Sequence, residues 1–273
     1  MQEPQKVRAH VLPTSDADEV IILIHGYNNS LDKADRSYQR FQDLLRHCSV
    51  RGSERLGPFW EFHWPGDHPL GVISLATYAC RIPDAGRSGD RLAAFLAKKS
   101  SSQTIHLVAH SLGCRVALSA IAKIRELQAD EEYAGARIGQ VFLLAAAVSE
   151  RLCERKESRP FSASFEYSRE HVFFSGWDAA LRAAPFGQYF YGERGQAVGR
   201  KGMPQGRWAT QFNTGLGHSE YWTSPSVAQD IAATLLPGSW KPKPKRLVGG
   251  QGRDVRELES LALPSRSVER RVA

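Results

Sequence analysis

Ser111 is the residue of this sequence best placed to act as a nucleophile. It stands in the pentapeptide Ala109-His110-Ser111-Leu112-Gly113, after an apolar run and before a helix-forming segment. Strand, tight turn and helix in this order are the context of the nucleophile elbow G-x-S-x-G, where the strand and the helix pass so close that the flanking residues must be small. Ala109 replaces the first glycine and adds only one methyl group. Serine also caps ordinary helices, so a catalytic role depends on partners elsewhere in the chain.

A serine hydroxyl needs a base, because at its free pKa it is a poor nucleophile. In open α/β sheets that carry such an elbow, the chain order is serine, acid, histidine. Of nine histidines only His171 and His218 follow Ser111. His171 begins a predicted strand, at the end remote from the catalytic edge, whereas His218 lies in a glycine-rich loop beyond the last predicted strand. We therefore expect His218 to be the base.

The acid that orients the base should follow a strand between Ser111 and His218, since ligands of open α/β sheets gather at the carboxyl ends of the strands. Asp178 comes directly after the predicted strand 171–175 and is the preferred candidate. Glu150 follows the predicted strand 141–148 and is the alternative, although it opens a charged segment. Asp178 could also simply cap a short helix over residues 179–184.

Two backbone N–H groups are candidates for an oxyanion hole. The turn His25-Gly26-Tyr27-Asn28-Asn29 follows an early buried strand, and the residue after the nucleophile is Leu112. Hydrolases of this architecture take one donor from each of these places. We assign the donors to the N–H groups of Tyr27 and Leu112, with a plain strand-to-helix turn as the alternative for the first. His25 and His110 precede the nucleophile, so we expect them to brace loops.

The apolar patterns predict the elements that must position these residues. Proline, glycine and polar clusters separate them. The segment at 70–99 is expected to be interrupted at Pro83, the segment at 150–170 to be irregular, and the glycine-rich segment at 185–207 to be a mobile surface loop. Strands are expected at 6–12, 20–24, 59–64, 105–108, 141–148, 171–175 and 208–212, and helices at 32–50, 88–99, 112–127 and 226–236.

The composition indicates one α/β domain in residues 1–236 and a basic tail in residues 237–273. The chain has 273 residues and a formal charge of +7, and the last 33 residues hold nine Lys/Arg against four Asp/Glu. We expect this tail to be disordered. No basic motif with interleaved aromatic residues accompanies the charge, so no nucleic acid is expected as a partner. The sequence shows neither a membrane span nor a secretory signal, which favours the cytoplasm. Four cysteines lack the spacing of a zinc site or a disulfide framework.

The chain resembles the α/β-hydrolase superfamily through HGYNNS, AHSLG, the position of Asp178 and GHSEYW. The resemblance covers roughly residues 20–236. It is closest to an uncharacterised group that shares a His-Gly-aromatic-Asn turn, a Trp-Pro after the following strand and a minimal cap. It implies an eight-stranded, mostly parallel sheet with helices on both faces, and a triad of Ser111, Asp178 and His218.

The sequence therefore predicts a serine hydrolase that cleaves a carboxylic ester of a small molecule through an acyl-serine intermediate. The chemistry requires no metal and no organic cofactor. A peptidase or amidase on the same triad is an alternative, and so is a non-catalytic binding protein on the same fold, because one scaffold of this kind hosts many functions.

Overall fold

One sheet of six parallel strands organises the chain, in the order β2-β1-β3-β4-β5-β6. The computed structural model describes residues 17–49, 56–66, 75–163, 169–182, 193–204 and 209–236. The strands are β1 (Glu19–Ile24), β2 (Phe59–Phe62), β3 (Thr104–His110), β4 (Arg137–Leu144), β5 (Glu170–Phe174) and β6 (Thr210–Asn213). The parallel sheet was correctly predicted, but the described residues form six strands rather than eight. The strand predicted at 6–12 lies outside the described residues.

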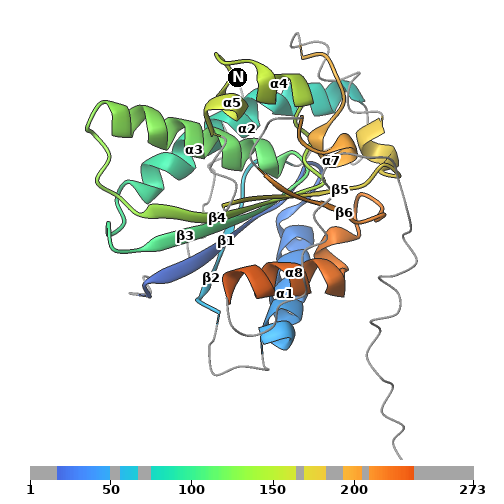
Figure 1. Cartoon of the computed structure of the whole chain (residues 1–273), viewed down its shortest axis with the longest axis horizontal. Coiled ribbons are helices and arrows are strands. Elements are labelled where there is room, and N and C mark those ends of the chain that lie inside the picture. The colour runs from blue at the N-terminus through green and yellow to red at the C-terminus, as the bar shows by residue number, and fades with distance from the viewer. Residues whose placement is uncertain are drawn as a thin grey trace, which may run out of the picture.

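Helices cover both faces of this sheet, as predicted (Figure 1). Helices α1 and α8 lie on one face, and α2 and α3 lie on the other. The helices are α1 (Leu31–Ser49), α2 (Leu75–Leu96), α3 (Gly113–Ala129), α4 (Glu150–Glu154), α5 (Arg159–Ala163), α7 (Val198–Lys201) and α8 (Pro225–Leu235), with the 3-10 helix η1 (Tyr221–Thr223). Because both faces are covered, the central strands are apolar along most of their length, as parallel sheets require.

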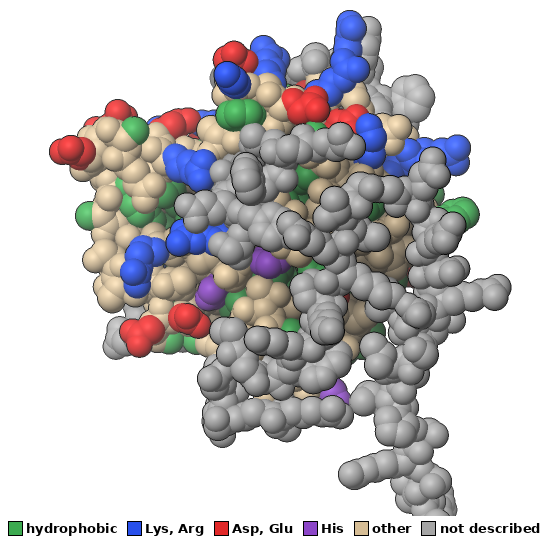
Figure 2. Space-filling model, in the orientation of Figure 1, with side chains coloured by type: hydrophobic (Ala, Val, Ile, Leu, Met, Phe, Trp, Pro, Cys, Tyr) green, Lys and Arg blue, Asp and Glu red, His purple; other side chains and the backbone are tan. Residues whose placement is uncertain are grey.

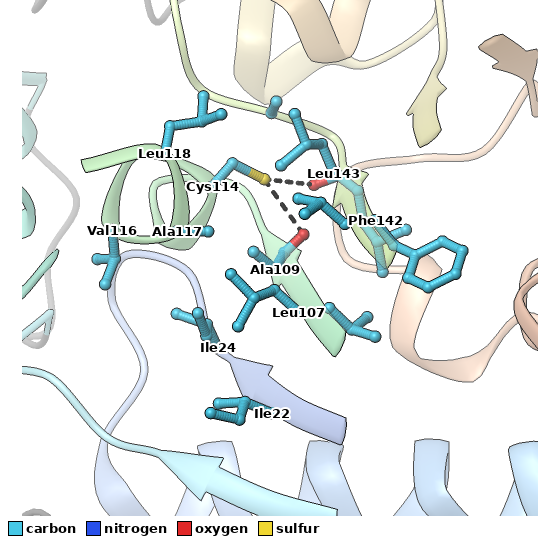
Figure 3. Close-up of a cluster of buried hydrophobic side chains, with 14 of the residues drawn as sticks. Ile22, Ile24, Leu107, Ala109, Cys114, Val116, Ala117, Leu118, Phe142 and Leu143 are labelled. Atoms are coloured by element: carbon cyan, nitrogen blue, oxygen red, sulfur yellow. Dashed lines mark hydrogen bonds between the residues drawn. The ribbon is translucent and has the colours of Figure 1, made fainter. Parts of the chain in front are cut away.

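Part of the core lies between β1, β3, β4 and helix α3, which follows Ser111. Figure 3 shows Ile22 and Ile24 of β1 beside Leu107 of β3, with Phe142 of β4 and several side chains of α3 around them. These residues are at most 2% exposed. The thiol of Cys114 donates to the carbonyl oxygen of Ala109 at 3.1 Å, which ties the first turn of α3 to the end of β3. The helix and the strand on either side of Ser111 are therefore packed as one unit.

Strand order also locates the place where a ligand can bind. The chain places β1 next to both β2 and β3, and its connections run in opposite directions from that point. Open α/β sheets form a crevice outside the carboxyl ends of the strands where the strand order reverses in this way. Residues that follow β1 and β3, among them Gly26 and Ser111, lie at this edge of the sheet.

Three predictions about single segments were wrong. Pro83 does not interrupt a helix but lies inside α2, where the buried side chains of Ile82 and Ala85 hold the helix against the core on both sides of the proline. The segment at 150–170 contains α4 and α5. In the glycine-rich segment, residues 193–204 include α7, and Ala197 and Val198 are buried. Packing against neighbouring elements, α3 for α2 and α5, and β5 for α7, outweighs the local preference.

Charges of both signs occur on the outer surface. Figure 2 shows acidic and basic side chains interspersed over the described part of one face, with neither kind covering it. No described helix has the length and apolar character needed to cross a membrane.

Candidate active site

Ser111 occupies the sharp turn between β3 and α3. Its φ of 55° lies in the left-handed region, which a non-glycine residue adopts only when its surroundings enforce it. Two hydrogen bonds enforce it here: Ser111 N–H donates to Leu144 O at 2.9 Å, and Ala147 N–H donates to Ser111 O at 3.1 Å. At Gly113 a Cβ atom would lie 2.3 Å from His25 O. The turn therefore requires a glycine two residues after the serine.

The structure brings Ser111, His218 and Asp178 together in one chain of hydrogen bonds. The Nε2 atom of His218 lies 2.9 Å from Ser111 Oγ, and its Nδ1 atom lies 2.8 Å from Asp178 Oδ2. Ser111 is 4% exposed and Asp178 is fully buried, whereas the His218 side chain is 25% exposed. A carboxylate that accepts from Nδ1 leaves the lone pair of Nε2 facing the hydroxyl. The histidine is thus oriented to accept the serine proton.

Asp178 fills both roles that its sequence position allows, because it orients His218 and also caps the short helical turn that follows it. Its Oδ2 atom faces His218, and its Oδ1 atom accepts a hydrogen bond from Leu181 N–H at 2.9 Å. The backbone of Asp178 is held as well, because its N–H donates to Ser175 O at 3.1 Å, just past β5. A carboxylate with both oxygens engaged has little freedom to rotate.

The two alternative residues lie in other environments. Glu150 begins α4, and its carboxylate pairs with Lys201 Nζ at 2.9 Å. His171 lies near the start of β5, where its Nε2 atom is 2.9 Å from Gln140 Oε1 and its ring stacks on Phe142. Burial lowers the pKa of His171 to about 4. Neither side chain takes part in the hydrogen bonds of Ser111.

The turn after β1 faces the elbow closely. A Cβ atom at Gly26 would lie 2.8 Å from Ser111 Cβ. The side-chain amide of Asn29 donates to Gly26 O at 3.2 Å and to Tyr27 O at 3.3 Å. Asn28 has a φ of 58°, and its N–H donates to Gly66 O at 2.7 Å. Leu112 is the N-cap of α3, so its N–H lies at the end of a helix where backbone donors point outward. The turn that carries Tyr27 and the start of α3 that carries Leu112 thus both lie next to Ser111.

Tyr38 and Trp64 support this turn, a role that the sequence did not predict for either residue. The hydroxyl of Tyr38 accepts from His25 N–H at 2.6 Å and donates to Phe62 O at 2.9 Å. The indole N–H of Trp64 donates to His25 O at 2.7 Å. The sequence signal for Trp64 was the Trp-Pro pair at the end of the predicted strand 59–64, and Tyr38 showed only the spacing of an inward helix residue. A hydrogen-bond network therefore joins the end of β2 to the turn after β1.

His25 and His110 are buried histidines that stay neutral. Desolvation lowers the pKa of His25 to about 4 and that of His110 to about 3. The proximity of His218 lowers the pKa of His110 further, because two cations there would repel. His25 Nδ1–H donates to Gly26 O at 2.8 Å, while its Nε2 faces Trp64 N–H at 3.3 Å. His110 Nε2–H donates to His218 O at 2.7 Å. Both side chains therefore brace loops of the site.

One group of side chains has the composition of a metal site. Asp35, Glu61 and His63 each place one ligand atom within 4.8 Å of the others. His63 Nε2 lies 3.1 Å from Asp35 Oδ1, and Gln42 donates to Glu61 Oε1 at 2.7 Å. These contacts account for the grouping without an ion. The four cysteines are free thiols.

Comparisons with known proteins identify the kind of molecule that carries this site. The model of a family described as alpha/beta hydrolase of unknown function (DUF900) matches residues 2–188. Among solved structures, a candidate hydrolase from Agrobacterium vitis S4 is 13% identical, with a TM-score of 0.43, over 81% of this chain and 90% of that chain. A lipase-esterase related protein from Clostridium acetobutylicum ATCC 824 is 11% identical, with a TM-score of 0.39, over 81% of this chain and 96% of that chain. No curated protein sequence matches the chain.

Proposed function

We propose that this chain, which belongs to the alpha/beta hydrolases of unknown function (DUF900) within the α/β-hydrolase superfamily, is a serine hydrolase. It cleaves a carboxylic ester through an acyl-serine intermediate. The observation that carries this proposal is the hydrogen-bonded series Ser111, His218 and Asp178. Its geometry supplies a nucleophile, a base within reach of the nucleophile's proton, and a buried carboxylate that orients the base.

Acylation begins when Ser111 Oγ attacks the ester carbonyl carbon and His218 Nε2 takes the hydroxyl proton. Asp178 remains ionised and stabilises the imidazolium. The carbonyl oxygen becomes an oxyanion, and the N–H groups of Tyr27 and Leu112 donate to it. Loss of one such donor typically lowers kcat by about 10²- to 10³-fold. When the C–O bond breaks, His218 returns the proton to the leaving alcohol and the acyl group stays on Ser111.

Deacylation repeats these steps with water as the nucleophile. His218 Nε2 accepts a proton from a water molecule, the water oxygen attacks the acyl carbon, and the bond to Ser111 Oγ breaks as the proton returns to the serine. The products are a carboxylic acid and regenerated enzyme. Each step uses only groups of this chain and water.

The substrate class that we propose is an ester with an apolar acyl or alcohol group. Trp177, next to Asp178, is 81% exposed. The ring of Tyr27 packs edge-on against Tyr78 at 5.7 Å between centroids. Aromatic side chains next to site residues in the chain can offer apolar surface to a ligand.

Labelling with a fluorophosphonate probe tests the proposal. We expect wild-type protein to be labelled and Ser111→Ala to remain unlabelled, since the probe phosphonylates only an activated serine. Hydrolysis of p-nitrophenyl esters of short and long acyl chains should then exceed that of the matching p-nitroanilides. Faster anilide cleavage would indicate a peptidase or amidase, and a wild-type protein without labelling or turnover would indicate a binding protein on this fold.

We also propose that the hydrolase domain lies within residues 1–236, because every described strand and helix lies between Glu19 and Leu235. A chain truncated after Leu236 should keep the labelling rate of the full chain. Loss of labelling on truncation would mean that residues 237–273 belong to the catalytic unit.

A further inference from the structure

The loop that carries His218 is tied at its start to β5, where Thr214 N–H donates to Phe174 O at 2.9 Å, and its next hydrogen bonds lie within the loop. Leu216 N–H donates to Thr214 Oγ1 at 3.3 Å, Gly217 N–H donates to the Glu220 carboxylate at 2.5 Å, and Glu220 N–H donates to Gly217 O at 3.1 Å. Such local bonds fix the shape of the loop. They do not join the backbone of His218 to the elbow, which requires a bond between the two segments.

His110 supplies such a bond. Its Nε2–H donates to the backbone carbonyl of His218 at 2.7 Å, across 108 positions of the chain. A carbonyl oxygen only accepts, so the proton of the neutral ring is on Nε2. His110 is the last residue of β3 and directly precedes Ser111. The backbone of the base is therefore attached to the residue next to the nucleophile.

Packing restricts the ring of His110 to this orientation. Its centroid lies 4.9 Å from that of His218, 5.8 Å from that of Trp222 and 6.0 Å from that of Tyr221. The side chain is 5% exposed, and its Nδ1 atom faces Gly26, where a Cβ atom would come within 3.0 Å. A buried donor held on three sides keeps its acceptor in a narrow range of positions.

We propose that His110 is a positioning residue that holds His218 at the distance from Ser111 required for proton transfer, by donating Nε2–H to the carbonyl of His218. This inference rests on the proposed function of the same site. It assigns to His110 no contact with substrate and no proton transfer. This role also explains why a histidine, whose imidazole is costly to bury, directly precedes the nucleophile in the sequence.

The neutral state of His110 is part of this role. A cation 4.9 Å from the His218 ring would oppose the imidazolium that forms during the reaction. Burial prevents this by holding the pKa of His110 far below its usual value. The side chain thus offers a hydrogen-bond donor without adding a charge.

Two substitutions separate the donor from the packing. His110→Phe keeps a ring and removes the N–H, whereas His110→Gln loses the ring but can place an amide N–H near the position of Nε2. We expect His110→Phe to lower kcat per active site by about 10- to 100-fold with little change in KM, because a misplacement of about 1 Å can cost about 10²-fold. The rate of fluorophosphonate labelling should fall by a similar factor. His110→Gln should recover most of both rates.

His171→Phe is the matched control, because it makes the same change at a buried neutral histidine whose Nε2 bonds to Gln140 away from the site. Its labelling rate per folded molecule should equal that of the wild type. A purely structural role for His110 would lower the folded fraction of His110→Phe and leave its rate per active site unchanged. That outcome would overturn the proposal, and so would a failure of His110→Gln to recover when it is folded.

A readout that needs no activity separates this inference from the proposed function. The Nδ1 proton of His218, bonded to Asp178, should give a downfield proton resonance in the NMR spectrum of the wild-type protein. If wild-type protein is not labelled, the serine hydrolase proposal fails. Loss of this resonance in His110→Phe and its return in His110→Gln would still support the positioning role, whereas an unchanged resonance in His110→Phe would refute it.

Discussion

Ser111 Cβ lies 2.8 Å from the position that a Cβ atom on Gly26 would occupy. This distance is below any ordinary contact between carbon atoms. The Cβ atom added at Gly26 would also lie 3.0 Å from His110 Nδ1 and 3.2 Å from His110 O. Two of these three atoms belong to the rigid elbow rather than to the end of a flexible side chain. A side chain at position 26 must therefore separate the turn after β1 from the nucleophile.

Gly26→Ala should reduce catalysis more than it reduces stability. We expect kcat/KM for a p-nitrophenyl ester to fall by at least about 10-fold, since the proposed oxyanion donor, Tyr27 N–H, moves with that turn. Overpacking of this kind typically costs about 1–3 kcal/mol in the free energy of unfolding. Ester hydrolysis and urea denaturation measure the two effects.

Gly86→Ala is the control for this substitution. Gly86 lies inside α2, and a Cβ atom there would meet nothing within 4 Å. We expect unchanged kcat/KM and a gain of about 0.5–1 kcal/mol in stability, because alanine favours the helix. Wild-type kcat/KM in Gly26→Ala would show that the turn after β1 does not contribute to the reaction.

Asp178→Asn should separate the orientation of His218 from the support of the backbone. The asparagine can keep an oxygen acceptor for Leu181 N–H, which now bonds Oδ1 at 2.9 Å, but its amide presents a donor to His218. The histidine then takes the other tautomer, and we expect kcat to fall by about 10⁴-fold. The urea midpoint should change little.

Glu150→Gln makes the corresponding change at the other candidate acid. Since Glu150 pairs with Lys201, we expect kcat to stay within about 2-fold of the wild type. A variant Asp178→Asn that retains a tenth of wild-type kcat, together with a large loss in Glu150→Gln, would reverse the assignment of the acid.

The positions of the three site residues were predictable because they follow from strand ends and chain order. A serine after one strand, an acid after a later strand and a histidine beyond the last strand must all reach the same edge of a parallel sheet. That argument needs only the presence and order of the strands. It does not need their exact limits.

The first and last residues of a strand were not predictable where apolar residues follow one another without alternating with polar ones. We expected a strand over residues 141–148, but β4 spans Arg137–Leu144. Ala145 has a φ of 47° and ends the strand, and a Cβ atom on Gly199 would lie 2.1 Å from Ala145 C. A continuous apolar sequence contains no signal for such a bend. The packing partner that requires it is 54 positions away.

Polar contacts between residues far apart in the chain were equally impossible to predict from the sequence. Arg115 and Glu193 are 78 positions apart and form two parallel bonds, with Nη1 to Oε1 at 2.7 Å and Nη2 to Oε2 at 2.5 Å. The glycine content around Glu193 predicted a mobile loop, yet its side chain is 8% exposed. Local composition carries no information on an ion pair that forms only in the folded chain.

Glu193→Gln should destabilise the protein strongly, because it leaves the Arg115 guanidinium buried beside a neutral amide. Removing one partner of a buried ion pair typically costs about 3–5 kcal/mol. The exposed pair of Lys123 and Glu126, at 3.1 Å, provides the control, and Glu126→Gln should cost less than about 1 kcal/mol. Urea denaturation of both variants gives the comparison. Equal losses would mean that the Arg115 pair contributes no more than a surface contact.

Stability should rise with pH in the acid range because buried histidines bind protons only after unfolding. Burial lowers the pKa of His171 to about 4 and that of His25 to about 4, from a usual value of 6.5. Between these values the unfolded chain holds more protons than the folded chain, so lowering the pH favours unfolding. The stabilisation is complete above pH 6.5 and is lost as the pH falls toward 4. Each such histidine contributes a slope of at most about 1.4 kcal/mol per pH unit.

His171→Phe isolates one of these contributions. The wild-type free energy of unfolding should drop between about pH 7 and about pH 5, and the drop should be smaller by about 2 kcal/mol in His171→Phe, since that variant has one proton fewer to bind on unfolding. His47→Gln is the control, because it removes an imidazole that is exposed on α1. Urea denaturation at the two pH values measures all three proteins. An identical drop in His171→Phe would mean that the buried imidazole is protonated equally in the folded and unfolded states.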